Sequence, residues 1–117
     1  MSMQMKWGAG IVAVALLTFG SSVWAASVVG SSDMGKKLYL ESCQHCHGAA
    51  GDGKSEMGAY LTPPPADLTS GKTQSKADAE LRKVIVEGRA GTAMTGYAMY
   101  DEQQLAHILA YIRSLKR

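Results

Sequence analysis

The residues of this chain that could do chemistry gather in one short stretch, "CQHCH", which runs from Cys43 to His47. Cys43 and Cys46 are the only two cysteines among 117 residues, and His47 directly follows the second. On a helix, positions i, i+3 and i+4 share one face, so two thiols and an imidazole would point at the same object. This trio could serve a metal site, a redox-active cysteine pair, a disulfide or a haem anchor.

Covalent haem attachment is the chemistry that uses all three side chains. A structural zinc site takes four ligands, and the chain has no third cysteine and no paired-histidine motif. A thioredoxin-like pair expects a βαβ context, and a disulfide across so short a loop would stabilise little. C-x-x-C-H is the attachment pattern of c-type haem. The sequence therefore favours one covalent haem c on Cys43 and Cys46, with His47 as an axial ligand of its iron.

Three helices are expected to position this motif. The first begins near Asp33, which can cap it, and runs through "MGKKLYLESC" into the cysteines. The second covers residues 75–88, with a capping arrangement at Ser75 and a stop at Gly88. The third covers residues 101–117, where apolar side chains repeat at i, i+3, i+4 and i+7. These side chains are Leu105, Ile108, Leu109 and Ile112.

Residues 48–74 separate the first two helices and have the composition of a loop. Glycines near the start of this stretch and three consecutive prolines argue against both helix and strand. A structureless loop of this length is unusual in a small domain unless it wraps something. The pattern predicts an all-α chain with long loops around a cofactor.

Residues 1–25 have the pattern of a signal peptide, in which a short basic region and an apolar run precede small residues. Cleavage after Ala25 is favoured. An uncleaved anchor is the alternative, because residues 7–26 carry no charge and approach membrane-spanning length. Both predict export to the periplasm, where free thiols rarely persist. Residues 26–32 then form a flexible lead-in, and residues 33–117 form one domain.

The charge balance argues against binding of nucleic acid. Twelve Lys and Arg residues stand against ten Asp and Glu residues, and the formal net charge is +2. Charges of both signs are interspersed, and neither a basic patch nor a nucleic-acid-reading motif is present.

The chain resembles the class I c-type cytochromes, the small mono-haem bacterial kind. "CQHCHGAAGDG" matches the C-x-x-C-H-G-x-x-G-x-G run of that family, and "LTPPPADLT" is similar to its Leu/Pro-rich loop. "GTAMTGY" resembles its methionine-ligand segment, and "LAYIRSL" its closing helix. The resemblance implies three main helices and long loops around one haem. It also implies a monomer that carries single electrons between redox proteins by transient contact.

A methionine is expected to bind the iron on the side opposite His47. Methionine in this position raises the reduction potential of the haem and favours electron transfer. Met94 and Met99 both lie in the irregular segment between the second and third helices. The resemblance favours Met94, which follows Gly-Thr-x and has an aromatic residue, Tyr97, three positions later. Thr95 stands where the family commonly has proline, so the loop loses a rigid φ angle.

The resemblance also implies two contacts made by other residues. It assigns the hydrogen bond that orients His47 to a proline carbonyl in the loop after the motif, and among the three adjacent prolines Pro63 fits the family spacing best. It places Gly35 and Tyr39 of the first helix against Tyr111 of the last.

The expected function is electron transfer in the periplasm, without catalysis by the chain itself. A second hypothesis is a haem subunit of a larger dehydrogenase or oxidase. A third is a haem-based ligand sensor or peroxidase, which requires a weakly held sixth position, as Thr95 would allow.

Overall fold

The computed structural model describes residues 2–4, 8, 10, 15, 20 and 27–117. The predicted cleavage after Ala25, and most of the apolar stretch before it, lie outside the described residues. In the part of the chain that is described, no helix is both long and apolar enough to cross a membrane.

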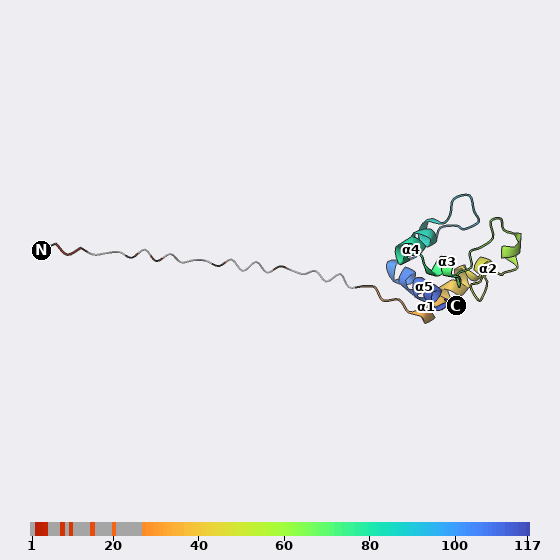
Figure 1. Ribbon diagram of the computed structural model, residues 1–117, viewed down its shortest axis with the longest axis horizontal. Helices are drawn as coiled ribbons and strands as arrows, with labels where there is room; N and C mark the ends of the chain where they lie inside the picture. Colours follow the sequence, from red (N-terminus) through yellow and green to blue (C-terminus); the bar gives the residue numbers. More distant parts are fainter. Residues whose placement is uncertain (1, 5–7, 9, 11–14, 16–19, 21–26) are drawn as a thin grey trace.

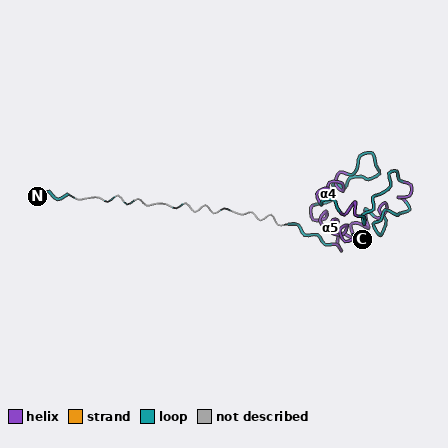
Figure 2. The backbone as a smooth tube through the Cα atoms, in the orientation of Figure 1, coloured by secondary structure: helices purple, strands orange, loops and turns teal. Residues whose placement is uncertain are grey.

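Residues 27–117 fold entirely with helices and loops, and Figure 2 shows no strand among them. The three longer helices correspond to the predicted ones, and they are α1 (Ser32–Ser42), α4 (Asp78–Glu87) and α5 (Glu102–Ser114). Three short elements lie between α1 and α4, and they are α2 (Gln44–His47), η1 (Met57–Tyr60) and α3 (Gly71–Gln74). The predicted all-α class with three main helices is confirmed, whereas the stretch 48–74 holds two short helices that composition did not indicate.

The cap of α1 is not the predicted residue. The hydroxyl of Ser31 accepts a hydrogen bond from the Met34 N–H at 3.4 Å, and Ser31 has extended backbone angles. Asp33 lies inside the first turn instead. A capping residue needs non-helical angles, so Asp33 cannot be the cap. Its negative charge there still interacts favourably with the positive end of the helix.

The start of α4 also differs from the prediction, while its end agrees. Ala77 precedes the helix and provides no side-chain cap. Ser75, the predicted cap, closes α3, and its hydroxyl donates to the Lys72 carbonyl at 3.3 Å. Gly88 ends α4 as expected, and its N–H donates to the Val84 carbonyl at 2.8 Å.

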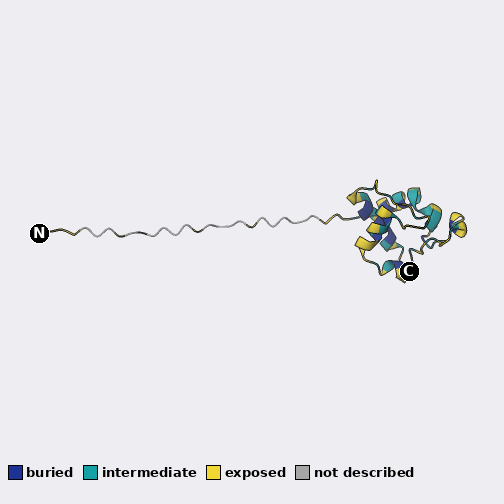
Figure 3. Ribbon diagram, turned by 90° about the horizontal axis from the view of Figure 1, so that it is seen from above, coloured by how far each residue is buried: buried dark blue, intermediate teal, exposed yellow. Residues whose placement is uncertain are grey.

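The hydrophobic core lies between α4 and α5, and α1 packs across α5. A capping box starts α5, because Asp101 and Gln104 each accept a hydrogen bond from the backbone N–H of the other. In Figure 3 the buried residues are dark blue, and the buried side chains of this core come from α4 and α5. They are Leu81, Ile85, Leu105, Ile108, Leu109 and Ile112.

The crossing of α1 over α5 depends on a glycine and a tyrosine pair. A Cβ atom at Gly35 would lie 1.9 Å from the His107 carbonyl oxygen, so only glycine fits without a shift. The rings of Tyr39 and Tyr111 meet with centroids 5.0 Å apart, which agrees with the expected contact. Figure 1 shows α1 and α5 side by side, with the loop after α4 and the loop that carries η1 extending away from them.

Candidate functional site

The helix that carries the cysteine motif is interrupted at its first cysteine. α1 ends at Ser42, α2 begins at Gln44, and Cys43 lies between them. The His47 N–H nevertheless donates to the Cys43 carbonyl at 2.9 Å, which is the i to i+4 bond of an α-helix. The helical spacing of Cys43, Cys46 and His47 is therefore kept. Both cysteines are free thiols, and all three residues are half-buried.

The imidazole of His47 is held by a backbone carbonyl that the sequence did not identify. Its Nδ1 lies 2.9 Å from the carbonyl oxygen of Ala66, so the assignment of this hydrogen bond to Pro63 is wrong. Because a carbonyl only accepts, Nδ1 carries the proton, and the lone pair of Nε2 is left for a metal.

The environment keeps this imidazole neutral. Burial lowers the pKa of His47 below its ordinary value, and the charge of Arg89 acts in the same direction. The hydrogen bond to Ala66 opposes them and raises the pKa. A neutral imidazole is the form that binds metals.

The loop after the motif folds back and brings Ala66 to the histidine. The Gly53 N–H donates to the His47 carbonyl at 2.8 Å, and Gly53 has a φ of 77°, which glycine adopts readily. A Cβ atom there would lie 2.8 Å from the Pro65 carbonyl oxygen. The glycines of this run thus let the proline-containing segment pass close to the motif.

The two thiols have different surroundings. Burial, and then the neighbouring Cys46, raise the pKa of the Cys43 thiol to about 11. The sulfur of Cys46 lies 3.9 Å from the thioether sulfur of Met57 in η1. Cys43 is therefore a protonated thiol at neutral pH.

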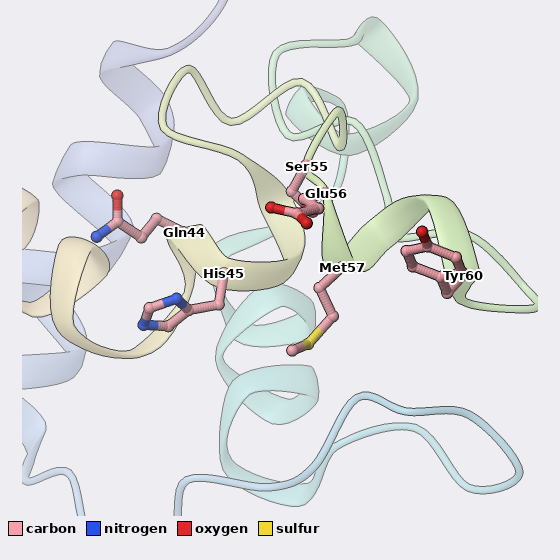
Figure 4. A pocket seen from close by; sticks show the side chains of 6 residues that line it. All are labelled: Gln44, His45, Ser55, Glu56, Met57 and Tyr60. Atoms are coloured by element: carbon pink, nitrogen blue, oxygen red, sulfur yellow. The ribbon is translucent and has the colours of Figure 1, made fainter.

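A cavity of about 610 Å³ adjoins the motif between α2 and η1. Figure 4 shows the side chains of His45 and Met57 extending below α2, with Tyr60 farther along η1. The lining residues are Gln44, His45, Ser55, Glu56, Met57 and Tyr60.

The two candidate methionine ligands differ in exposure. Met94 is half-buried in the loop after α4, whereas Met99 is 74% exposed. The Met94 N–H donates to the Thr92 hydroxyl at 3.2 Å, and the Met94 carbonyl accepts from the Arg89 N–H at 3.0 Å. Both backbone polar groups of Met94 are therefore hydrogen-bonded within the loop.

Sequence reasoning also missed the contacts between the Met94 loop and the end of α1. The Tyr97 hydroxyl donates to the Ser42 carbonyl at 3.0 Å. The Ser42 and Tyr100 hydroxyls share a hydrogen bond at 2.6 Å. Only the serine and tyrosines themselves were visible in the sequence, because nothing in it indicates which distant residues meet.

The side chains of this site fit a covalently held haem. Two free thiols separated by two residues can bond to the two vinyl groups of the ring. A neutral imidazole oriented through Nδ1 offers Nε2 to iron, and a thioether is a suitable second axial ligand.

Comparison with known proteins points to one family. The family model described as Cytochrome c matches residues 32–116. The Cbb3-type cytochrome c oxidase subunit FixP of Bradyrhizobium diazoefficiens is 33% identical over 82 residues, which cover 69% of this chain and 26% of that protein. The Cbb3-type cytochrome c oxidase subunit CcoP of Azospirillum brasilense is 29% identical over 86 residues, which cover 73% and 28%. The chain thus spans about a quarter of the length of these curated relatives.

A solved structure has a similar fold. The KustC0563 c-type cytochrome superposes with a TM-score of 0.60, and the match covers 71% of this chain and 98% of that one. At 22% sequence identity, this likeness concerns the fold alone.

Proposed function

Because the chain belongs to the cytochrome c family, whose members hold haem covalently and transfer electrons, we propose that it is a periplasmic carrier of single electrons with one haem c. Cys43 and Cys46 would hold the ring through thioether bonds. His47 would bind the iron on one side and Met94 on the other. When bound, the haem supplies an iron that alternates between two oxidation states, at a potential set by its axial ligands and burial.

The hydrogen bond from His47 Nδ1 to the Ala66 carbonyl is the observation that carries this proposal. It fixes the tautomer and the ring orientation and raises the basicity of the ligating nitrogen, as outer contacts of metal-bound histidines do. Burial has the opposite effect on basicity and lowers the pKa of His47, which keeps the ring in the neutral form that binds metals.

The choice of Met94 as the sixth ligand is supported by burial. Met94 is half-buried, whereas Met99 and Met57 are 74% and 55% exposed. An axial thioether must face the haem rather than water. The thioether sulfur of Met57 also lies 3.9 Å from the sulfur of Cys46, one of the two cysteines that would hold the haem.

The test compares Met94→Ala with the matched variant Met99→Ala, both matured in a host that assembles c-type haem. We expect Met94→Ala to lose the methionine–iron absorption feature and to bind carbon monoxide at neutral pH, while Met99→Ala keeps the spectrum of the parent. Loss of the feature in Met99→Ala alone would refute the assignment. Binding of carbon monoxide by the parent protein without unfolding would favour the sensor or peroxidase hypothesis.

Covalent attachment has its own test. The haem should remain on the polypeptide through denaturing electrophoresis, and the double variant Cys43→Ala/Cys46→Ala should lose it. Haem that leaves the parent chain on denaturation would overturn the proposal.

Export and oligomeric state are separate parts of the proposal. We expect the exported protein to begin after Ala25, to be monomeric and to meet redox proteins through small transient contacts. N-terminal sequencing and light scattering check these points, and an intact Met1 would favour the anchored, periplasm-facing alternative.

A second candidate function is that of an electron-transfer subunit in a larger complex. It is favoured by the relatives, since both are oxidase subunits and this chain matches about a quarter of each. Purification under mild detergent from the native membrane should then recover the chain with a catalytic partner. Recovery of the chain alone in the soluble fraction would favour the free carrier.

A further inference from the structure

The break between α1 and α2 leaves a backbone carbonyl free for another partner. In a continuous helix the Cys46 N–H would donate to the Ser42 carbonyl. Here it donates to the Cys43 carbonyl at 3.3 Å instead. The Ser42 carbonyl, one residue before the first cysteine, is thus one of the acceptors at a helix end that need a donor from elsewhere.

That donor comes from the loop that carries Met94. The Tyr97 hydroxyl donates to the Ser42 carbonyl at 3.0 Å. The Ser42 side chain shares a second hydrogen bond with the Tyr100 hydroxyl at 2.6 Å. The two tyrosine rings are stacked, with centroids 5.8 Å apart and an interplanar angle of 17°. One serine therefore receives two side chains from the opposite loop.

The backbone of this loop makes hydrogen bonds to α4 and within the loop itself, and the rings of Tyr97 and Tyr100 pack against the core between α4 and α5. The Tyr97 N–H donates to the Ile85 carbonyl at 2.8 Å, and the Arg89 N–H donates to the Met94 carbonyl at 3.0 Å. These bonds shape the loop, but they do not tie it to the cysteine motif. Thr95, which follows Met94, also lacks the rigid φ angle of a proline.

We propose that Tyr97 is a positioning residue for the sixth iron ligand. Its hydroxyl and the Ser42 carbonyl form a latch, hereafter the Tyr97–Ser42 latch, between the Met94 loop and the residue that precedes the covalent anchor. The latch compensates for the missing proline by fixing the loop at its end rather than within its backbone. This inference rests on the proposed function, because it requires Met94 to be the ligand.

The test removes one hydroxyl and measures how easily a competing ligand displaces Met94. Tyr97→Phe keeps the ring and its stacking but loses the hydrogen bond. Imidazole binds iron only in molecules whose Met94 loop has opened, so its apparent affinity reports the open population. Loss of a neutral hydrogen bond predicts an increase of about fivefold in that affinity. The methionine–iron absorption feature should also fade at a lower temperature than in the parent, while the far-ultraviolet circular dichroism melt changes less.

Tyr60→Phe is the matched control, since Tyr60 is 84% exposed on η1 and is remote from the latch in sequence. It should leave imidazole affinity unchanged. Ser42→Ala provides a second variant that removes the Tyr100 hydrogen bond and keeps the carbonyl, and it should raise the affinity less than Tyr97→Phe does. If Tyr97→Phe binds imidazole no more tightly than Tyr60→Phe, the latch is refuted. If Met94→Ala keeps the methionine–iron feature, the ligand assignment fails instead.

Discussion

Gly35→Ala should be among the most damaging small substitutions in this protein. Gly35 is buried where α1 crosses α5. An added Cβ atom would lie 1.9 Å from the carbonyl oxygen of His107 and 2.8 Å from the Cβ atom of Tyr111. Both distances are far shorter than a van der Waals contact. The nearest obstacle is backbone, so no rotamer change can relieve the clash, and the two helices must separate.

The magnitude follows from two opposing terms. Alanine in a helix is more stable than glycine by about 0.5–1 kcal/mol, chiefly because alanine loses less backbone conformational entropy than glycine on folding. Overpacking of a closed contact costs about 1–3 kcal/mol. The upper end applies here because separation of the helices would also disturb the contact between Tyr39 and Tyr111. The net expectation is a loss of about 2 kcal/mol in the free energy of unfolding.

Guanidinium denaturation of the haem-loaded protein, followed by far-ultraviolet circular dichroism, measures this loss. The midpoint should fall while the slope with denaturant stays the same, since the surface exposed on unfolding does not change. Gly71→Ala is the control, because a Cβ atom there meets nothing within 4 Å. A Gly35→Ala midpoint equal to that of Gly71→Ala would show that the crossing tolerates a methyl group, and the close-approach argument would fail.

Three further predictions concern single side chains. Tyr39→Phe removes the buried hydroxyl that donates to the Gly48 carbonyl at 2.5 Å. The free energy of unfolding in urea should fall by about 1–2 kcal/mol. An unchanged midpoint would mean that water replaces the hydroxyl. The Arg113 guanidinium donates to the Asp78 carboxylate and to the carbonyls of Gln74 and Lys76, and lysine cannot reproduce this fork. Arg113→Lys should therefore lower the free energy of unfolding by about 1 kcal/mol in thermal denaturation. Equal stability would contradict this. Two hydrogen bonds from Thr69 hold the pKa of the Asp67 carboxyl below its ordinary value of 3.8. The stabilisation they give is present above pH 3.8 and is lost as the pH falls through the lower pKa of the folded state. Asp67→Asn should therefore weaken the acid dependence of unfolding, and an identical acid limb would count against the assignment.

The helices were predictable to the extent that their signals are local. The apolar repeat of α5 and the acidic residues at its start lie within one stretch, and the structure confirms the helix with a capping box at Asp101. The cap of α1 was less predictable, because Ser31 and Asp33 are both good capping residues. Only the backbone angles, which packing of the lead-in against α5 constrains, decide between them. The short elements α3 and η1 were missed because four residues carry too little pattern.

The cysteine motif was predictable for the same reason, since its three side chains lie within five residues. The sixth ligand could not be chosen from residue types alone, because Met94 and Met99 both lie in the irregular segment between α4 and α5. The two methionines differ in burial, which is a tertiary property. The resemblance to a family chose between them, and the choice stays a prediction that the iron spectrum must test.

Three of the contacts missed around the site share one physical cause. His47 bonds to the carbonyl of Ala66, Tyr97 to that of Ser42, and Tyr39 to that of Gly48. Each acceptor is a backbone oxygen, and every residue type offers the same one, so the sequence carries no mark of it. Such a contact depends on the path of the chain and not on the identity of the accepting residue. Substitution of the Ala66 side chain should thus leave His47 oriented, whereas a one-residue deletion in the loop before it should not.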